Sequence, residues 1–180
     1  MKPIGPLMIE HRLIERIFVV VHKQARLAVE KKQIDPALID TAVDFIRWYA
    51  DKTHHGKEEA ILFRDVARKD MNAEHRRLMQ ELTDEHDFGR RTVGRLVEAR
   101  EQYVRGEGEA LNVILNIAET LVHFYREHIR KEDKILYPAC MEYLDEQEQA
   151  AMLQEFGEAD RQMIHAKYNA VVDQLEKTAQ

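Results

Sequence analysis

The segment HHGKEEAILF at residues 54–63 recurs without gaps as HIRKEDKILY at residues 128–137, an offset of 74 positions. The dipeptide EH at residues 10–11 recurs more weakly at residues 85–86, at an offset of 75. Each half of the chain therefore carries a histidine and, further along, a His-x-x-x-Glu motif. This internal repeat decides how the rest of the sequence is interpreted, because the repeated positions are those of metal-ligand side chains.

Apolar residues recur at helical spacing through five segments, which short turns separate. Seven glycines and four prolines among 180 residues are too few for the many turns of an all-β protein. We predict an all-α fold: an up-down-up-down four-helix bundle with an additional C-terminal fifth helix. Residues 1–180 would form a single domain, with the bundle core at about 6–143 and the extra helix at about 145–178.

Start and stop signals give the expected bounds of these helices. Asp35 followed by Pro36 is an N-cap signal, as are Asn72 and Asp145, and Pro138 is expected to break the fourth helix. The five expected helices run from about Pro6 to Lys32, from Pro36 to Lys69, from Asn72 to Arg105, from the Gly106-Glu107-Gly108 turn to Tyr137, and from Asp145 to Lys177.

Charge and composition argue against several classes of protein. The net charge is −6 with the basic residues scattered, so we expect no nucleic-acid partner. The longest apolar run, Ile17 to Val21, is far shorter than a membrane span, and no leader sequence is recognisable. Cys140 is the single cysteine, which fits a reducing compartment and inert packing. We therefore expect a cytoplasmic protein that does not associate with membranes, and the sequence indicates no particular protein partner.

The repeated polar residues are expected to meet inside the bundle. Two residues on an antiparallel helix pair lie at one height when they are equidistant from the connecting turn. The turns at residues 32–36, 70–72 and 106–108 satisfy this condition for the repeated histidines and His-x-x-x-Glu motifs. Apolar residues at helical spacing place the same faces inward. One buried layer is then predicted to contain His11, His54, Glu58, His86, His128 and Glu132.

Such a layer requires positive charge. Burying two carboxylates and four imidazoles without partners costs several kcal/mol or more per uncompensated charge. With one cysteine in the chain, the ligands must be nitrogen and oxygen, which suits two octahedral first-row metal ions. Iron is the leading candidate. A structural zinc site, which usually takes four ligands, fits six converging residues less well, and manganese is less favoured than iron.

These residues resemble the hemerythrin-like, or HHE cation-binding, family, over roughly residues 7–138. The family pattern is a His, a His-x-x-x-Glu, a second His and a second His-x-x-x-Glu on four successive helices. The resemblance implies that Glu58 and Glu132 bridge two iron ions, with an oxo or hydroxo group completing the bridge. It also implies the terminal ligands, which are His11 and His54 on one ion and His86 and His128 on the other.

The oxygen-carrying hemerythrins differ from this chain at two points. Their third helix supplies two histidines four residues apart, whereas the positions four residues either side of His86 are Leu82 and Arg90. One coordination position is then open, or filled by water or another side chain. Those carriers also use His-x-x-x-x-Asp, which Asp133 satisfies, so Glu132 and Asp133 are both candidates for the bridge. The internal repeat favours Glu132.

The function indicated is a non-haem di-iron protein that binds or senses a small ligand, namely oxygen, nitric oxide or iron itself. The alternative is a di-iron redox enzyme acting on peroxide or nitric oxide, or an iron donor for iron-sulfur cluster repair. Whether the protein is an enzyme is left open. A third hypothesis treats the metal as structural and the fifth helix as a docking surface. The expected partner is a small diatomic molecule or peroxide.

The remaining polar residues near the motifs are interpreted as structural. His22 and His75 lie far from the layer. His55 and Glu59 lie next to His54 and Glu58 in the sequence, and the alternative interpretation is that either one binds the metal or holds a metal ligand in place. The other residues considered are Glu10 and Glu85 as solvated or capping neighbours, Tyr125 as a core residue that could gate the site, and His123 and His165 as a pair at one height.

Overall fold

The computed structural model describes residues 2–160 and 164–178. Within that part of the chain the regular elements are all helical, so the all-α prediction is confirmed. The elements are α1 (Ile4–Lys31), α2 (Pro36–Phe45), η1 (Ile46–His55), η2 (Glu58–Phe63), α3 (Arg64–Val66), α4 (Ala73–Val104), α5 (Ala110–Lys131), η3 (Glu132–Leu136), α6 (Tyr137–Tyr143), α7 (Glu146–Ala159) and α8 (Ile164–Thr178).

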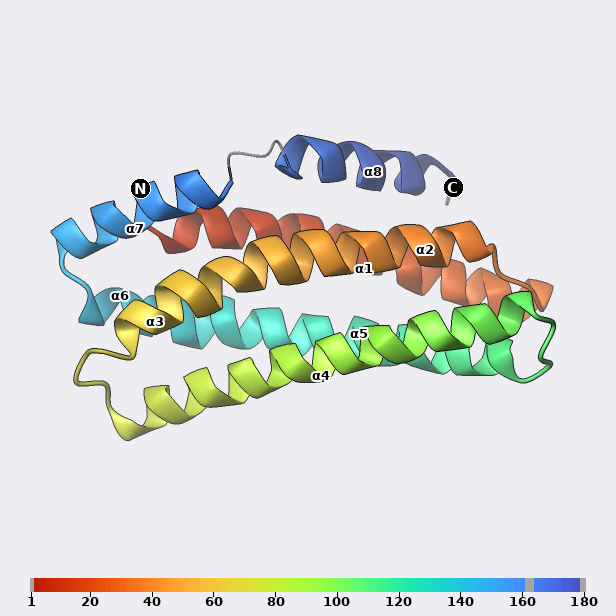
Figure 1. The fold of residues 1–180 in the computed structure, drawn as a ribbon, viewed down its shortest axis with the longest axis horizontal. Helices are drawn as coiled ribbons and strands as arrows, with labels where there is room; N and C mark the ends of the chain where they lie inside the picture. The colour runs from red at the N-terminus through yellow and green to blue at the C-terminus, as the bar shows by residue number, and fades with distance from the viewer. Residues whose placement is uncertain (1, 161–163, 179–180) are drawn as a thin grey trace.

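Figure 1 shows α1, the continuous run from α2 to α3, α4 and α5 side by side along the long axis of the molecule. Helices α1 and α4 each pack against α5, and α2 packs against α4. The two C-terminal helices, drawn in blue, lie along one side of this group (Figure 1). There α8 packs against α1 and η1, and α7 packs against η2. The C-terminal helices therefore cover the helices that carry the first His-x-x-x-Glu motif.

The predicted start signals form the expected contacts. The Asp35 side chain accepts a hydrogen bond from the backbone N–H of Ala37 at 2.9 Å. Asn72 accepts one from the backbone of His75 at 2.7 Å. Asp145 forms a reciprocal capping box with Glu148. Each contact satisfies an N–H group that has no partner within its own helix.

Wide helical turns occur where the sequence predicted uninterrupted α-helix. In η1, η2 and η3 the backbone is π-helical, so its hydrogen bonds span five residues rather than four. These segments contain His54, His55, Glu58 and Glu132. Turns of this kind are rare and are frequently found at functional sites. They therefore mark the predicted polar layer in the backbone as well as in the side chains.

Two expectations about the C-terminal third of the chain were wrong. Pro138 does not end the fourth helix, because it is the second residue of α6, directly after the π-helical turn η3, where the regular α-helical hydrogen bonding is already interrupted. The helical path continues to Tyr143. The single extra helix expected at about 145–178 is instead two helices, α7 and α8 (Figure 1), and residues 161–163 between them lie outside the described residues.

Apolar side chains pack in two clusters, one on each side of the polar layer along the helices. Leu7 and Leu82 belong to one cluster, whereas Ile14 and Val93 belong to the other. The polar layer is thus enclosed within the apolar core. Along none of the described helices is there a stretch both long and apolar enough to cross a membrane.

Gly106 and Gly108, in the turn before α5, allow a matched test of backbone strain. Gly106 has φ of 81°, whereas an added Cβ at either glycine meets nothing within 4 Å. Gly106→Ala should therefore lower the free energy of unfolding by about 1 kcal/mol, because L residues disfavour positive φ. Gly108→Ala should leave it unchanged or raise it slightly. Urea unfolding of both metal-free variants tests this, and equal effects at the two positions would contradict the assignment.

Candidate metal centre

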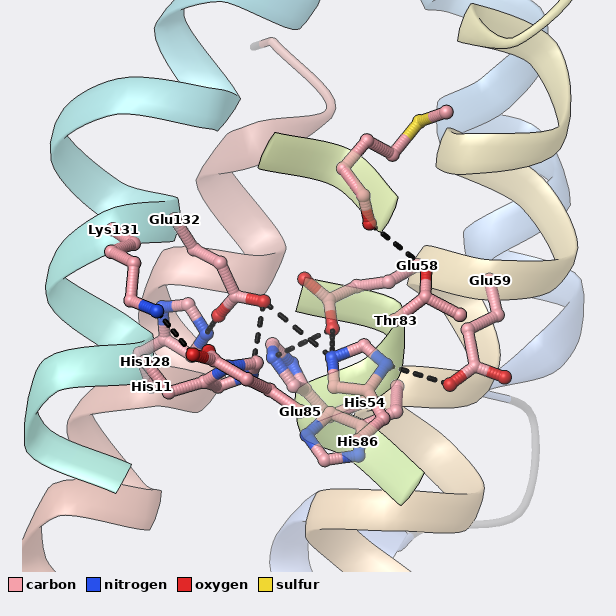
Figure 2. A network of polar contacts seen from close by, with 12 residues as sticks. His11, His54, Glu58, Glu59, Thr83, Glu85, His86, His128, Lys131 and Glu132 are labelled. Atoms are coloured by element: carbon pink, nitrogen blue, oxygen red, sulfur yellow. Dashed lines mark hydrogen bonds and ion pairs between the residues drawn. The ribbon is translucent and has the colours of Figure 1, made fainter. Parts of the chain in front are cut away.

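The six predicted ligands come from six different elements and converge in one part of the molecule (Figure 2). Their side chains are each at most 1% exposed. His11 lies on α1, His54 on η1, Glu58 on η2, His86 on α4, His128 on α5 and Glu132 on η3.

Glu132 lies between histidines from the two halves of the chain. Its Oε2 is 3.1 Å from Nε2 of His11, and its Oε1 is 3.1 Å from Nε2 of His128. Oε1 is also 3.6 Å from Nε2 of His86. One carboxylate thus faces ligand nitrogens of both halves.

Glu58 lies in the same relation to the other histidines. Its Oε2 is 3.6 Å from Nε2 of His54 and 3.4 Å from Nε2 of His86. Its other oxygen, Oε1, accepts a hydrogen bond of 2.6 Å from the hydroxyl of Tyr137. Each carboxylate is therefore placed to share its oxygens between two positions, as a bridging ligand does.

Most polar atoms that face this centre have no hydrogen-bond partner in the described part of the chain. They are Nε2 of His54, His86 and His128, Oε2 of Glu58, and both carboxylate oxygens of Glu132. Buried polar atoms without partners are costly and rare in native proteins. A cation bound among these atoms would remove that cost, so the donor set fits a metal of the kind that nitrogen and oxygen ligands hold.

The outward-facing nitrogen of each of the four predicted histidine ligands is held by a carboxylate. Such a bond fixes the tautomer and leaves the lone pair of Nε2 directed at the centre, as is usual for metal-binding histidines. The Nδ1 atoms donate to Asp133 from His11 at 2.7 Å, to Glu10 from His54 at 2.8 Å, to Glu59 from His86 at 2.6 Å, and to Glu85 from His128 at 2.9 Å.

The family model described as the hemerythrin HHE cation binding domain matches residues 3–140, which include all these ligands and their carboxylate partners. The chain belongs to the hemerythrin HHE cation-binding domain family. The resemblance inferred from the sequence motifs is thereby confirmed. Neither the curated proteins nor the solved structures contain a match. The match ends before α7 and α8, so this hemerythrin domain carries a C-terminal extension.

The structure corrects the interpretation of Glu10 and Glu85 as solvated or capping neighbours. Glu10 is 2% exposed, and both carboxylates hold metal-layer histidines. Each acidic residue precedes one histidine of the layer in the sequence but bonds to a different one on the next helix. Periodicity within a single helix does not reveal such a pairing. Asp133 likewise holds His11 from outside, so Glu132 is the residue that faces the centre.

His55 is a further donor in the hemerythrin layer. It is 3% exposed and its ring stacks on that of His86, with centroids 3.8 Å apart. Ligand atoms of His55, His86 and His128 lie within 4.8 Å of one another. A second such group contains His11, His54, Glu58 and Glu132. His55, on η1, is thus placed to be an additional ligand beside His86 and His128.

Tyr137 is a site residue that sequence reasoning missed. Besides its bond to Glu58, its ring lies parallel to that of His11, with centroids 5.5 Å apart. The internal repeat contained a signal, because it aligns Tyr137 with Phe63, whose ring stacks on His86. Tyr137 has a hydroxyl group that Phe63 lacks. Tyr137 can therefore donate a hydrogen bond to a carboxylate of the layer, whereas Phe63 cannot.

The other histidines do not join the layer. His75 bonds to Asn72 and Tyr143. His123 is exposed beside Glu119, whereas His165 contacts Tyr49, so the expected pairing of His123 with His165 does not occur. His22 lines surface hollows between α1 and α5.

Cys140 is buried, and burial raises the pKa of its thiol to about 12, which keeps it unreactive.

Protons bind tightly to this layer when no metal competes. Burial acts to lower the pKa of His11 and His128, but their carboxylate neighbours outweigh it and raise each pKa to about 9. Burial and the nearby charge of Glu132 raise the pKa of Glu58. The bound protons thus balance the negative charge of the carboxylates in the metal-free layer. A metal ion that binds there must displace these protons.

Metal affinity should consequently increase as the pH rises from 7 to 9. At pH 7 the imidazoles of His11 and His128, with pKa values of about 9, carry protons in the metal-free domain. Filling the layer should then release at least two protons, and the competition from His11 and His128 should fade above pH 9. Cobalt(II) titration against a chelator at several pH values, with proton release followed by an indicator, measures this. An affinity independent of pH would contradict the assignment.

Proposed function

We propose that this hemerythrin domain is a non-haem di-iron protein that binds or senses a small ligand: oxygen, nitric oxide or iron itself. The two iron ions would share an oxo or hydroxo bridge inside an up-down-up-down four-helix bundle. One observation supports this proposal above the others. Glu58 and Glu132 each lie beside a histidine from both halves of the chain, which is the arrangement that two bridged ions require and one tetrahedral zinc does not.

His11 and His54 would be the terminal ligands of one ion, and His86 and His128 those of the other, joined there by His55. Iron supplies reversible redox change and affinity for small ligands. The protein neutralises the ions with Glu58 and Glu132 and holds the imidazole rings in place through their Nδ1 hydrogen bonds. Apolar packing on both sides keeps bulk water out of the layer.

A small pocket supports access of a diatomic ligand to one end of the layer. It has a volume of about 100 Å³, and His55, His86, Gly89 and Tyr125 are among its lining residues. A water molecule occupies roughly 30 Å³ in the liquid, so the pocket has room for a ligand of two or three atoms. Arg90 also lines it and bonds to Asp51 at 2.8 Å. A larger hollow of about 500 Å³, lined in part by Asp35 and Leu175, lies away from the layer.

Elemental analysis tests the di-iron assignment. Untagged protein purified without added metal, or loaded anaerobically with ferrous iron, should contain about two irons per chain. Glu132→Ala should lose at least one of them, because it removes the carboxylate between His11 and His128. Glu127→Ala, an exposed substitution on α5, is the matched control and should retain both.

One zinc per chain, or no metal after ferrous loading of well-folded protein, would overturn the di-iron proposal. Exposure of the reduced protein to oxygen then separates the roles. One stable, reversible spectrum supports binding or sensing, whereas repeated consumption of ligand supports the enzymatic alternative.

Filling the pocket should slow the entry of small ligands without removing the metal. Gly89 lines the pocket, and a Cβ there would lie 3.8 Å from the hydroxyl of Tyr125, another lining residue, so Gly89→Leu should narrow it. A steric barrier of about 1.4 kcal/mol would slow azide binding to the iron-loaded protein about tenfold. Gly94→Leu is the control, because an added Cβ there meets nothing within 4 Å. Equal azide binding rates in the two variants would rule this entrance out.

A further inference from the structure

The carboxylates that hold the four histidines are themselves held by cations. Such partners of a ligand orient it and tune its basicity, although they do not touch the metal. Arg12 bonds to Asp133, Lys57 to Glu10, Arg90 to Glu59, and Lys131 to Glu85. Lys57 and Lys131 occupy equivalent positions of the internal repeat, as do their partners Glu10 and Glu85. The repeat therefore includes a lysine, a carboxylate and a histidine in each half.

The two lysines differ in their surroundings. The Lys131 side chain is 17% exposed and also bonds to Glu81, whose side chain is 52% exposed. The Lys57 side chain is 1% exposed and donates to both oxygens of Asp160, at 2.7 and 2.9 Å. Asp160 follows α7, beyond the residues that the family model matches. The C-terminal extension thus changes one of two otherwise equivalent arrangements.

Asp160 is held firmly in this position. His165 on α8 lies with Nε2 at 3.2 Å from Asp160, and its Nδ1 is 3.1 Å from the Tyr49 hydroxyl. The Lys57 ammonium also lies 5.8 Å from the centre of the Phe156 ring on α7, within range of a cation–π attraction. The extension thereby encloses Lys57 between Glu10 and Asp160.

Burial determines how strongly Asp160 interacts with Lys57 and how strongly Glu81 interacts with Lys131. Charge pairs at a protein surface are weakened by water and salt, whereas the same pair in the interior interacts several times more strongly. The Glu81–Lys131 pair is of the first kind. The Asp160–Lys57 pair is closer to the second, because the Lys57 side chain is 1% exposed and that of Asp160 is 21% exposed. Loss of Asp160 would leave the Lys57 ammonium incompletely bonded, and Glu10 would then have to adjust.

We propose that Asp160 is a positioning residue of the metal centre, which acts through Lys57 and Glu10 to fix the imidazole of His54. The C-terminal extension thereby makes the metal position at His11 and His54 different from the position at His86 and His128. This inference rests on the proposed two-metal function. Asp160 itself does not contact the metal.

Cobalt(II) binding to the full chain tests the inference. Metal-free wild-type protein, Asp160→Asn and the matched control Glu81→Gln would be titrated against a chelator, with cobalt absorption as the spectroscopic signal. Asp160→Asn should weaken one of the two affinities about tenfold or more and alter the absorption of that step. Asp160→Glu should restore it. Glu81→Gln should change neither affinity by more than about threefold.

Proton NMR of the cobalt-loaded variants adds a readout that a merely structural role would not change. One paramagnetically shifted imidazole N–H signal, that of His54, should move in Asp160→Asn, and none should move in Glu81→Gln. Helical circular dichroism checks folding, and Asp160→Ser repeats the measurement if Asp160→Asn does not fold.

Wild-type affinities and N–H signals retained in a folded Asp160 variant would overturn the inference while leaving the two-metal function intact. Wild-type protein that binds no cobalt would instead refute the proposed function, and this inference with it.

Discussion

The structure depends on the burial of two carboxylates whose inward oxygens have few protein partners. Desolvation opposes charge at Glu58 and Glu132, and the surrounding apolar clusters exclude the water that would otherwise solvate them. Only positive charge within the layer makes this arrangement favourable. The carboxylates on the outer nitrogens fix the imidazole rings so that Nε2 faces the layer, where a metal ion or a bound proton supplies that charge.

Much of the centre could be predicted from sequence because helical geometry is regular. Equal distances from the turns, together with the repeat, suffice to place His11 and Glu132 at one height although they are far apart in the chain. The partners Glu10 and Glu85 could not be found in this way, because each bonds across to another helix. The same limit applies to Asp160, since nothing in the periodicity of α7 indicates that its end reaches Lys57. Side-chain pairing between helices is a property of the packed molecule.

The wide turns explain why His54 and His55 could not both be assigned from sequence. Neighbouring residues on an α-helix point about 100° apart, which argues that only one of them faces the core. The π-helical backbone of η1 relaxes that restriction, and both side chains are buried. His54 belongs to the group with His11, whereas His55 belongs to the group with His86. Consecutive residues thus serve different ends of the layer.

Two of the four hydrogen bonds on the outer nitrogens cross between the two halves of the chain. His11, in the first half, relies on Asp133 in the second, 122 residues away, and His86 in the second half relies on Glu59 in the first. Each half holds one of its own two histidines, His54 or His128, but depends on the other half for its second. Both halves of residues 10–133 must therefore be folded together before all four imidazoles are held in place.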